Sequence, residues 1–162
     1  MRKKRAAADS GFTLVELLVV VVIIGVLVAI AVPMYLNYRK GAANKSAESD
    51  VRAAVSAIEQ FYTENSNAYP EDGKATYSDT VQSLTFGTTN SGEGSAATGG
   101  TPQHATLSPG NTLSYKQGAN GSYWVCGMNA DGGQVYVYNS ATGGSVKKAT
   151  TNKLGDCESA GK

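Results

Sequence analysis

The stretch Gly11-Phe12-Thr13-Leu14-Val15-Glu16-Leu17-Leu18 opens the most apolar part of the chain. No polar side chain occurs from Leu17 to Val32, and the 25 residues from Phe12 to Leu36 contain one charged residue, Glu16. This run is longer than the minimum of about 18 residues for a membrane-spanning helix. Because a carboxylate inside an apolar helix is unfavourable in lipid, Glu16 is a candidate functional residue.

The charged residues before this run predict its orientation. Four basic residues, Arg2, Lys3, Lys4 and Arg5, place the N-terminus on the cytoplasmic side and the rest of the chain across the membrane. The formal net charge of the whole chain is +1, and a chain that began at Phe12 would carry 10 basic and 12 acidic residues. This balance excludes a nucleic-acid-binding surface that depends on bulk positive charge.

Three interpretations of the first 36 residues compete. A secretory signal would use Ala29-Ile30-Ala31 as its cleavage site, but the apolar run is longer than the usual length of about 7–15 residues. A plain single-pass anchor explains the length and the orientation but leaves Glu16 without a role. The third interpretation uses every feature, because Gly11-Phe12-Thr13-Leu14-Val15-Glu16 resembles the class III signal of type IV pilins and pseudopilins.

The resemblance implies how this segment is processed and used. In that family a membrane peptidase cuts after the glycine and methylates the new N-terminal residue, so the implied cut lies between Gly11 and Phe12, with N-methylation of Phe12. Glu16 matches the family's glutamate, which pairs with the N-terminal amine of a neighbouring subunit during assembly. A positive amine nearby relieves the unfavourable energy of a carboxylate in lipid. The alternative is a protonated Glu16 that merely sits near the membrane interface.

Gly25 and Pro33 are the two helix-weakening residues of the apolar run. Both residue types are common in membrane helices, but Pro33 lacks an N–H and should loosen the preceding turn. In the resembling family, glycine and proline at these positions bound a segment that loses helicity in the filament. The resemblance therefore predicts a weak stretch from Gly25 to Pro33.

After Tyr38 the helical pattern continues but becomes amphipathic. Apolar residues recur at spacings of three and four, and they form one face: Ala43, Ala47, Val51, Ala54, Val55, Ile58, Phe61 and Tyr62. The charged residues fall mostly elsewhere: Lys45, Glu48, Asp50, Arg52, Glu59 and Glu64. The pattern predicts one helix from Phe12 to about Glu64, roughly 80 Å long at about 1.5 Å per residue. Its second half must pack on something, and a sheet is the expected partner.

The composition changes near Tyr69, and 16 of the 19 glycines lie at Gly73 or later. Residues 67–111 are expected to form a flexible connecting loop rich in Gly, Ser and Thr. From residue 112 onward, alternating apolar residues separated by turn signals predict short strands at 113–116, 122–128, 134–138 and 144–148. Hairpin-type breaks between them predict an antiparallel meander.

The predicted fold class is α+β: a long N-terminal helix, membrane-spanning in its first half and amphipathic in its second, packed on a C-terminal antiparallel β-meander as in pilins. The expected domains are a cleaved leader (1–11), a transmembrane and filament-core helix (12–36), the amphipathic half of the helix (37–66), the loop (67–111) and a sheet with a disulfide-closed C-terminal segment (112–162). Cys126 and Cys157 lie where an oxidising environment permits a disulfide, and the resemblance favours a bond between them. Thiols with the wrong geometry would stay free.

Patterns for catalysis and metal binding are weak. The single histidine, His104, lies in a Thr/Pro/Gly-rich loop and has no partner set for nucleophilic catalysis. Asn129, Asp131 and Asn139 could join a calcium site, but their spacing is not that of an EF-hand loop, and turn formation explains them more simply. We therefore expect a protein that is not an enzyme and needs no cofactor or metal.

The resemblance implies a structural subunit of a bacterial type IV pilus, which polymerises through its N-terminal helix into a surface filament for adhesion, motility or DNA uptake. The implied partners are other copies of the chain, the prepilin peptidase, an assembly ATPase with its platform protein, and the cytoplasmic membrane before assembly. DNA and a host surface stay open as further partners. The alternatives are a pseudopilin of a type II secretion system and a membrane-anchored binding module that does not polymerise.

Overall fold

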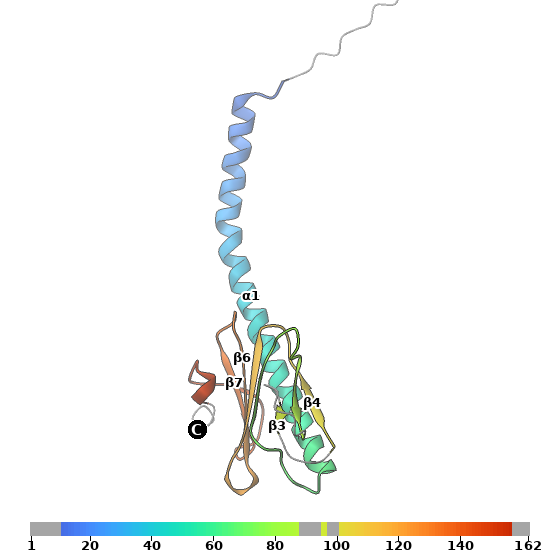
Figure 1. Ribbon diagram of the computed structural model, residues 1–162. Coiled ribbons are helices and arrows are strands. Elements are labelled where there is room, and N and C mark those ends of the chain that lie inside the picture. Colours follow the sequence, from blue (N-terminus) through green and yellow to red (C-terminus); the bar gives the residue numbers. More distant parts are fainter. Residues whose placement is uncertain (1–10, 88–94, 97–100, 157–162) are drawn as a thin grey trace, which may run out of the picture. The chain divides into compact units, whose positions relative to one another are not determined.

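The computed structural model describes residues 11–87, 95, 96 and 101–156 (Figure 1). The chain divides into two compact units between Tyr38 and Arg39. We call residues 14–38 the bare segment and the described residues from 39 onward the C-terminal unit.

One long helix is followed by short strands. The bounds of the elements are α1 (Leu14–Glu64), β1 (Gly73–Thr76), β2 (Ser83–Phe86), β3 (Ser95–Ala96), β4 (Gln103–Thr106), β5 (Asn111–Gln117), the 3₁₀ turn η1 (Ala119–Gly121), β6 (Tyr123–Asn129), β7 (Val135–Asn139), β8 (Lys147–Lys148) and the 3₁₀ turn η2 (Leu154–Asp156). Helix α1 is the blue-to-green coil in Figure 1, and it continues without interruption past Pro33. The predicted fold class, a long helix and an antiparallel sheet, is confirmed.

The second half of α1 buries the apolar face that the sequence predicts, together with three residues outside it. Of the predicted stripe, five residues are buried: Ala47, Val51, Ala54, Ile58 and Phe61. Ala43, Val55 and Tyr62 are half-buried. Ala57, Glu48 and Asp50 are buried as well. The expectation that charged residues fall mostly outside the packed face therefore does not hold for Glu48 and Asp50. Asp50 meets buried and half-buried polar partners, whereas Glu48 pairs with the exposed cations of Lys45 and Arg52.

The larger sheet has the strand order β1-β5-β6-β7-β8, and every neighbouring pair is antiparallel. Strands β5 to β8 follow one another in sequence, so the predicted meander is present. The last strand is shorter than the sequence predicts, because only Lys147 and Lys148 pair with β7. Both lysines are exposed, which discourages further pairing at this edge.

Segment 67–111 differs from the predicted connecting loop, because its described residues form four strands. Strand β1 extends the larger sheet by pairing with β5, and β2 forms a smaller sheet with β3 and β4 in the order β3-β2-β4. Each of these strands has four residues or fewer. Such short strands depend on their partners more than on their own propensity. Of the four-residue strands, only β2 alternates polar and apolar residues along its length, and four residues are too few to predict a strand together with its pairing.

The larger sheet buries side chains on both faces, with alternate residues of β6 contributing to each. The main core contains residues of α1 and of both sheets, among them Ile58, Phe86 and Val125. The opposite face of the larger sheet carries a smaller cluster: Cys126, Val135, Val137, Ala149 and Leu154, with Trp124 and Met128 beside it. Helix and sheet are in close contact at Gly127, where an added Cβ would lie 2.5 Å from Val51 Cγ2.

Candidate functional site

The predicted processing segment leads into a capped helix start. Thr13 precedes α1, and its carbonyl accepts the first helical hydrogen bond from Leu17 N at 3.3 Å. Glu16 Oε2 accepts hydrogen bonds from Thr13 N at 2.9 Å and from the Thr13 hydroxyl at 2.7 Å. Glu16 N donates in return to Thr13 Oγ1 at 3.3 Å. These reciprocal bonds form a capping box, which satisfies backbone donors at the start of the helix.

The capping role of Glu16 was not predicted, although its signal is present in the sequence. A threonine followed three residues later by a glutamate, just before an apolar run, is the capping-box pattern. The carboxylate also lies at the positive end of the helix dipole, which favours negative charge there. Glu16 therefore has donors within its own subunit, and an incoming amine would add a charge partner to a carboxylate that is already held in place.

Phe12 lies just outside the helix, and its side chain is 80% exposed. Within the described residues, the hydrogen bonds of the Glu16 carboxylate go to Thr13 and not to Phe12. In the uncut chain the Phe12 nitrogen is a peptide amide bonded to Gly11, so it carries no positive charge. The amine that the predicted pairing requires therefore exists only after the Gly11–Phe12 bond is cut.

The bare segment presents apolar side chains on all sides. Its large apolar residues are between 48% and 82% exposed. An 18-residue window of α1 has a mean hydropathy of 3.2, and none of that window is buried. Of the helices that the structure describes, α1 is the one long and apolar enough to cross a membrane. Such a surface requires lipid or other protein chains around it.

Gly25 and Pro33 both lie inside the unbroken helix. A Cβ added at Gly25 would meet nothing within 4 Å, so packing inside the subunit does not require a glycine there. A missing side chain on an exposed helix face lets a second helix approach closely. The predicted weakness between Gly25 and Pro33 concerns the filament, and it stays a prediction.

Cys126 is fully buried in β6, on the sheet face that carries the smaller cluster. No free cysteine occurs among the residues described. Cys157, its predicted partner, lies outside those residues. The bond between Cys126 and Cys157 therefore stays a prediction.

The residues considered for calcium form turns. Asn129 Oδ1 accepts a hydrogen bond from Asp131 N at 2.9 Å, and Asn139 Oδ1 accepts one from Ala141 N at 2.9 Å. This confirms the turn interpretation. Across the described ranges, no cluster of three or more His, Cys, Asp or Glu residues is arranged to hold a metal ion.

The single histidine lies in a cross-strand pair. His104 on β4 is opposite Thr85 on β2, and its Nδ1 is 2.9 Å from Thr85 Oγ1. Both side chains belong to the exposed side of the smaller sheet. Pairing between neighbouring strands accounts for this contact.

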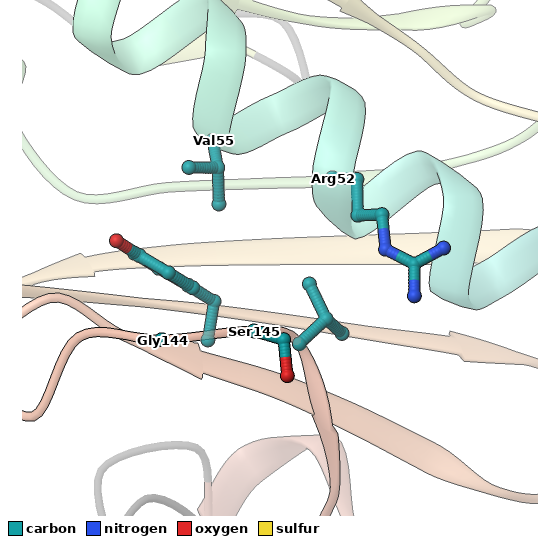
Figure 2. Close-up of a pocket in the computed structure, with 6 residues that line it drawn as sticks. Arg52, Val55, Gly144 and Ser145 are labelled. Atoms are coloured by element: carbon teal, nitrogen blue, oxygen red, sulfur yellow. The ribbon is translucent and has the colours of Figure 1, made fainter.

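A hollow of about 240 Å³ lies between α1 and the segment that follows β7, and its lining is Arg52, Val55, Tyr138, Gly144, Ser145 and Val146. Figure 2 shows Arg52 and Val55 projecting from the helix toward the chain at Gly144 and Ser145. The Arg52 guanidinium forms an ion pair with Glu48. Among the described residues that line the hollow, Ser145 is the one non-aromatic hydroxyl, and none is a carboxylate or a histidine. The lining therefore lacks a base that could activate a nucleophile.

A buried polar network, which the sequence did not predict, joins α1 to the larger sheet. Asp50 Oδ2 accepts hydrogen bonds from Ser108 N and from Asn111 Nδ2, both at 2.6 Å, and Oδ1 accepts one from the Ser108 hydroxyl at 2.9 Å. Asn111 Oδ1 accepts a further bond from Asn129 Nδ2 at 2.6 Å. The partners of Asp50 lie 58 and 61 residues away in sequence, so no local pattern could have indicated them.

Comparisons with known proteins match both the processing segment and most of the chain. Residues 7–32 match the family model described as the prokaryotic N-terminal methylation motif. Fimbrial protein Q of Moraxella bovis is 31% identical over 138 residues, which cover 75% of this chain and 87% of that relative. Type II secretion system core protein G of Vibrio cholerae is 31% identical over 131 residues, covering 80% of this chain and 86% of the relative.

A third relative resembles a shorter part of the chain more strongly. A fimbrial protein of Pseudomonas aeruginosa is 44% identical over 69 residues, which cover 40% of this chain and 45% of that relative. No solved structure matches the chain. The methylation motif coincides with the segment that holds Gly11, Phe12 and Glu16, and the first two relatives are matched over more than four fifths of their length. The chain therefore belongs to the type IV pilin family, in which fimbrial proteins and core protein G of type II secretion systems are its relatives.

Proposed function

We propose that the chain is the structural subunit of a type IV pilus and polymerises through α1 into a surface filament. The proposal rests on the bare segment, where an 18-residue window of mean hydropathy 3.2 has no buried part. The subunit folds without covering this surface, so lipid must surround it before assembly and other copies afterwards. Exchange of lipid for neighbouring helices keeps the segment in apolar surroundings throughout. Small residues on the helix, such as Gly25 and Ala29, allow the close approach that this exchange needs.

Processing would create the charge that assembly uses. A prepilin peptidase would cut between Gly11 and Phe12 and methylate the new N-terminus. The Phe12 nitrogen would then change from a neutral amide to a cationic amine. The new charge would lie at the same end of α1 as the Glu16 carboxylate, because Glu16 follows Phe12 by four residues.

The Glu16 carboxylate would then bind the amine of a second copy. Thr13 already donates to it through N–H and hydroxyl at 2.9 and 2.7 Å, which fixes the carboxylate at the helix start. An ion pair between copies lowers the energy of this charge in apolar surroundings. Because the pair forms only when two helices lie at matching depth, it would also set how far an incoming subunit is raised relative to its neighbour.

The topology and the remaining partners follow from this role. The N-terminus would lie in the cytoplasm, with one pass through the cytoplasmic membrane, and the C-terminal unit would lie on the far side until assembly carries it to the cell surface. An assembly ATPase and its platform protein would supply the energy for extraction from the membrane. The chain would act as a building block of the filament and not as an enzyme.

A second candidate function is that of a pseudopilin in a type II secretion system. The observation that favours it is the match to core protein G of Vibrio cholerae, which covers 86% of that relative. Electron microscopy of filaments sheared from the cell surface distinguishes the two functions. Labelling of long surface filaments by an antibody against the C-terminal unit supports a pilus subunit, whereas their absence under conditions of normal secretion supports a pseudopilin.

Mass spectrometry of the N-terminal peptide of the mature protein tests the proposal. We expect a chain that begins at Phe12 and carries one N-methyl group. A chain that begins at Met1 would indicate a plain anchor, and one that begins at Val32 would indicate an ordinary secretory signal. Either result would contradict the proposed processing, and a bulky substitution at Gly11 should leave the leader attached.

A further inference from the structure

A chain of aromatic rings leads from the surface of the C-terminal unit to its core. Tyr123 lies at the centre of this chain of rings and is fully buried. The ring centroids of Tyr69, Tyr115 and Tyr138 lie 5.0, 5.8 and 5.8 Å from that of Tyr123. Tyr62 stacks on Tyr69 at 4.4 Å. Since Tyr62, Tyr69 and Tyr138 are only half-buried, the buried ring is one or two ring contacts away from solvent.

The hydroxyl group of Tyr123 has a carboxylate as its partner. It donates a hydrogen bond to Glu59 Oε1 at 2.5 Å. Glu59 is an exposed residue of α1, so the same carboxylate contacts both the buried phenol and water. Burial, together with the hydrogen bond to Glu59 and its negative charge, raises the pKa of Tyr123, so the phenol keeps its proton in the resting state.

Two neighbouring aromatic groups lack this arrangement. The Tyr115 hydroxyl donates to the backbone carbonyl of Pro70 at 3.0 Å, and a carbonyl cannot take up a proton at neutral pH. Trp124 Nε1 is buried and has no hydrogen-bond partner in the part of the chain that the structure describes. A phenol that loses an electron becomes a strong acid and must release its proton to a base within hydrogen-bond reach. Tyr123 has such a base, whereas Tyr115 and Trp124 do not.

We propose that Tyr123 is a site of one-electron oxidation, served by the ring chain and by Glu59 as proton acceptor. The oxidant is a small one-electron oxidant at the surface, such as an organic peroxyl radical. The electron of Tyr123 passes through Tyr138, or through Tyr69 and Tyr62, to this oxidant. The O–H bond of Tyr123 breaks and its proton forms an O–H bond with Glu59. The products are a neutral Tyr123 phenoxyl radical, a neutral Glu59 carboxylic acid and, after uptake of a proton from water, a hydroperoxide.

The hollow beside α1 provides a point of access for the oxidant. Tyr138 lines this hollow. The hollow has a volume of about 240 Å³, which admits a small molecule (Figure 2). An electron taken from Tyr138 is replaced from Tyr123 across a centroid distance of 5.8 Å. The radical then stays on Tyr123 because its phenolic proton has moved to the Glu59 carboxylate, and burial shields it from solvent radicals.

Photochemical oxidation of the full-length protein in detergent micelles tests this inference. The probe is ruthenium(III) tris(bipyridine), generated by a light flash in the presence of persulfate, with electron paramagnetic resonance as the readout. We expect one dominant, hydrogen-bonded tyrosyl radical in the unsubstituted protein. Tyr123→Phe should abolish this signal, whereas Tyr136→Phe should keep it, because Tyr136 is equally part of the core at 3% exposure but outside the ring contacts above.

Glu59→Gln removes the proton acceptor without disturbing the fold, because Glu59 is exposed and every ring stays in place. We expect loss of the stable radical in Glu59→Gln and its retention in Glu64→Gln, an exposed carboxylate near the end of the same helix. Near-ultraviolet circular dichroism checks that each variant is folded. An unchanged radical in folded Tyr123→Phe or in Glu59→Gln would overturn the proposal. So would a radical in the unsubstituted protein that is spread over the exposed tyrosines of the bare segment. Since the experiment uses unassembled subunits, its outcome is independent of filament formation.

Discussion

The two halves of helix α1 differ in how far their side chains are exposed, and the more apolar half is the more exposed one. In the bare segment nearly every residue is apolar, yet Leu27 is 61% exposed. In the second half charged residues are frequent, yet Phe61 is only 2% exposed and Ile58 is fully buried. The less apolar half is thus the one that the subunit covers with its own sheets. A hydrophobic pattern states that a surface must be covered, but it does not state whether the same chain, the lipid or another copy covers it.

This difference predicts that folding and assembly depend on separate parts of one helix. Substitutions in the second half should change the stability of the C-terminal unit and leave processing at Gly11 unaffected. Substitutions in the bare segment should change assembly and leave that stability unaffected.

The largest change in stability is expected for Phe61→Ala. Phe61 belongs to the main core, and its truncation should lower the free energy of unfolding by about 3–5 kcal/mol through lost burial and a residual cavity. The matched substitution in the bare segment, Leu27→Ala, should change it by less than about 0.5 kcal/mol. Urea titration of the full chain in micelles, followed by the fluorescence of the single tryptophan, measures both. Equal losses in the two variants would contradict the separation of the two halves.

The next largest change is expected for Asp50→Ala, which removes the acceptor at the centre of the buried polar network. Ser108 and Asn111 would keep their donors without partners, which should lower the free energy of unfolding by about 2–3 kcal/mol. Asp79→Ala provides the control, because Asp79 is exposed and should be neutral within about 0.5 kcal/mol. If the two aspartate variants unfold at the same urea concentration, the network does not stabilise the fold.

The smallest effect concerns Glu48 and acid. The pKa of Glu48 lies below its ordinary value of 4.5, chiefly because Lys45 Nζ donates a hydrogen bond to it at 2.8 Å and also because Arg52 lies beside it. The stability that this carboxylate contributes is therefore fully present above pH 4.5 and is lost as the pH falls through its lowered pKa. Because both cations are exposed, we expect a loss of only about 0.5 kcal/mol. Urea titrations at a series of pH values should show this acid-induced loss in the unsubstituted protein and a flatter profile in Glu48→Gln.

The sequence predicted those parts of the fold that local periodicity determines. The continuous apolar run and the stripe from Ala47 to Phe61 repeat within a few residues, so they indicated both halves of α1 and the face that packs. Turn signals such as Asn129-Ala130-Asp131-Gly132-Gly133 likewise indicated the hairpins of the meander. At the N-terminus, Gly11, Phe12 and Glu16 were found because they form one contiguous motif.

The remaining features depend on partners that are distant in sequence. Strand β1 forms because Ala75 pairs with Leu113, and nothing within its own four residues indicates this. Asp50 and Glu59 were placed on the polar face, since a helical pattern cannot distinguish a solvated carboxylate from one that meets Asn111 or the Tyr123 hydroxyl. The capping box at Thr13 was different, because its signal is local and was overlooked in favour of the intermolecular role of Glu16.

The most direct test of the account is filament formation by two variants of Glu16, with Glu71→Gln as the control at an exposed carboxylate. Glu16→Gln keeps a side chain that can complete the capping box but removes the charge, whereas Glu16→Ala removes both. The account predicts that both variants are cut after Gly11 and that neither forms filaments, while Glu71→Gln forms them normally. Normal filaments from Glu16→Gln would contradict the central claim, because they would show that the helix cap, and not an ion pair between copies, is what assembly requires of Glu16.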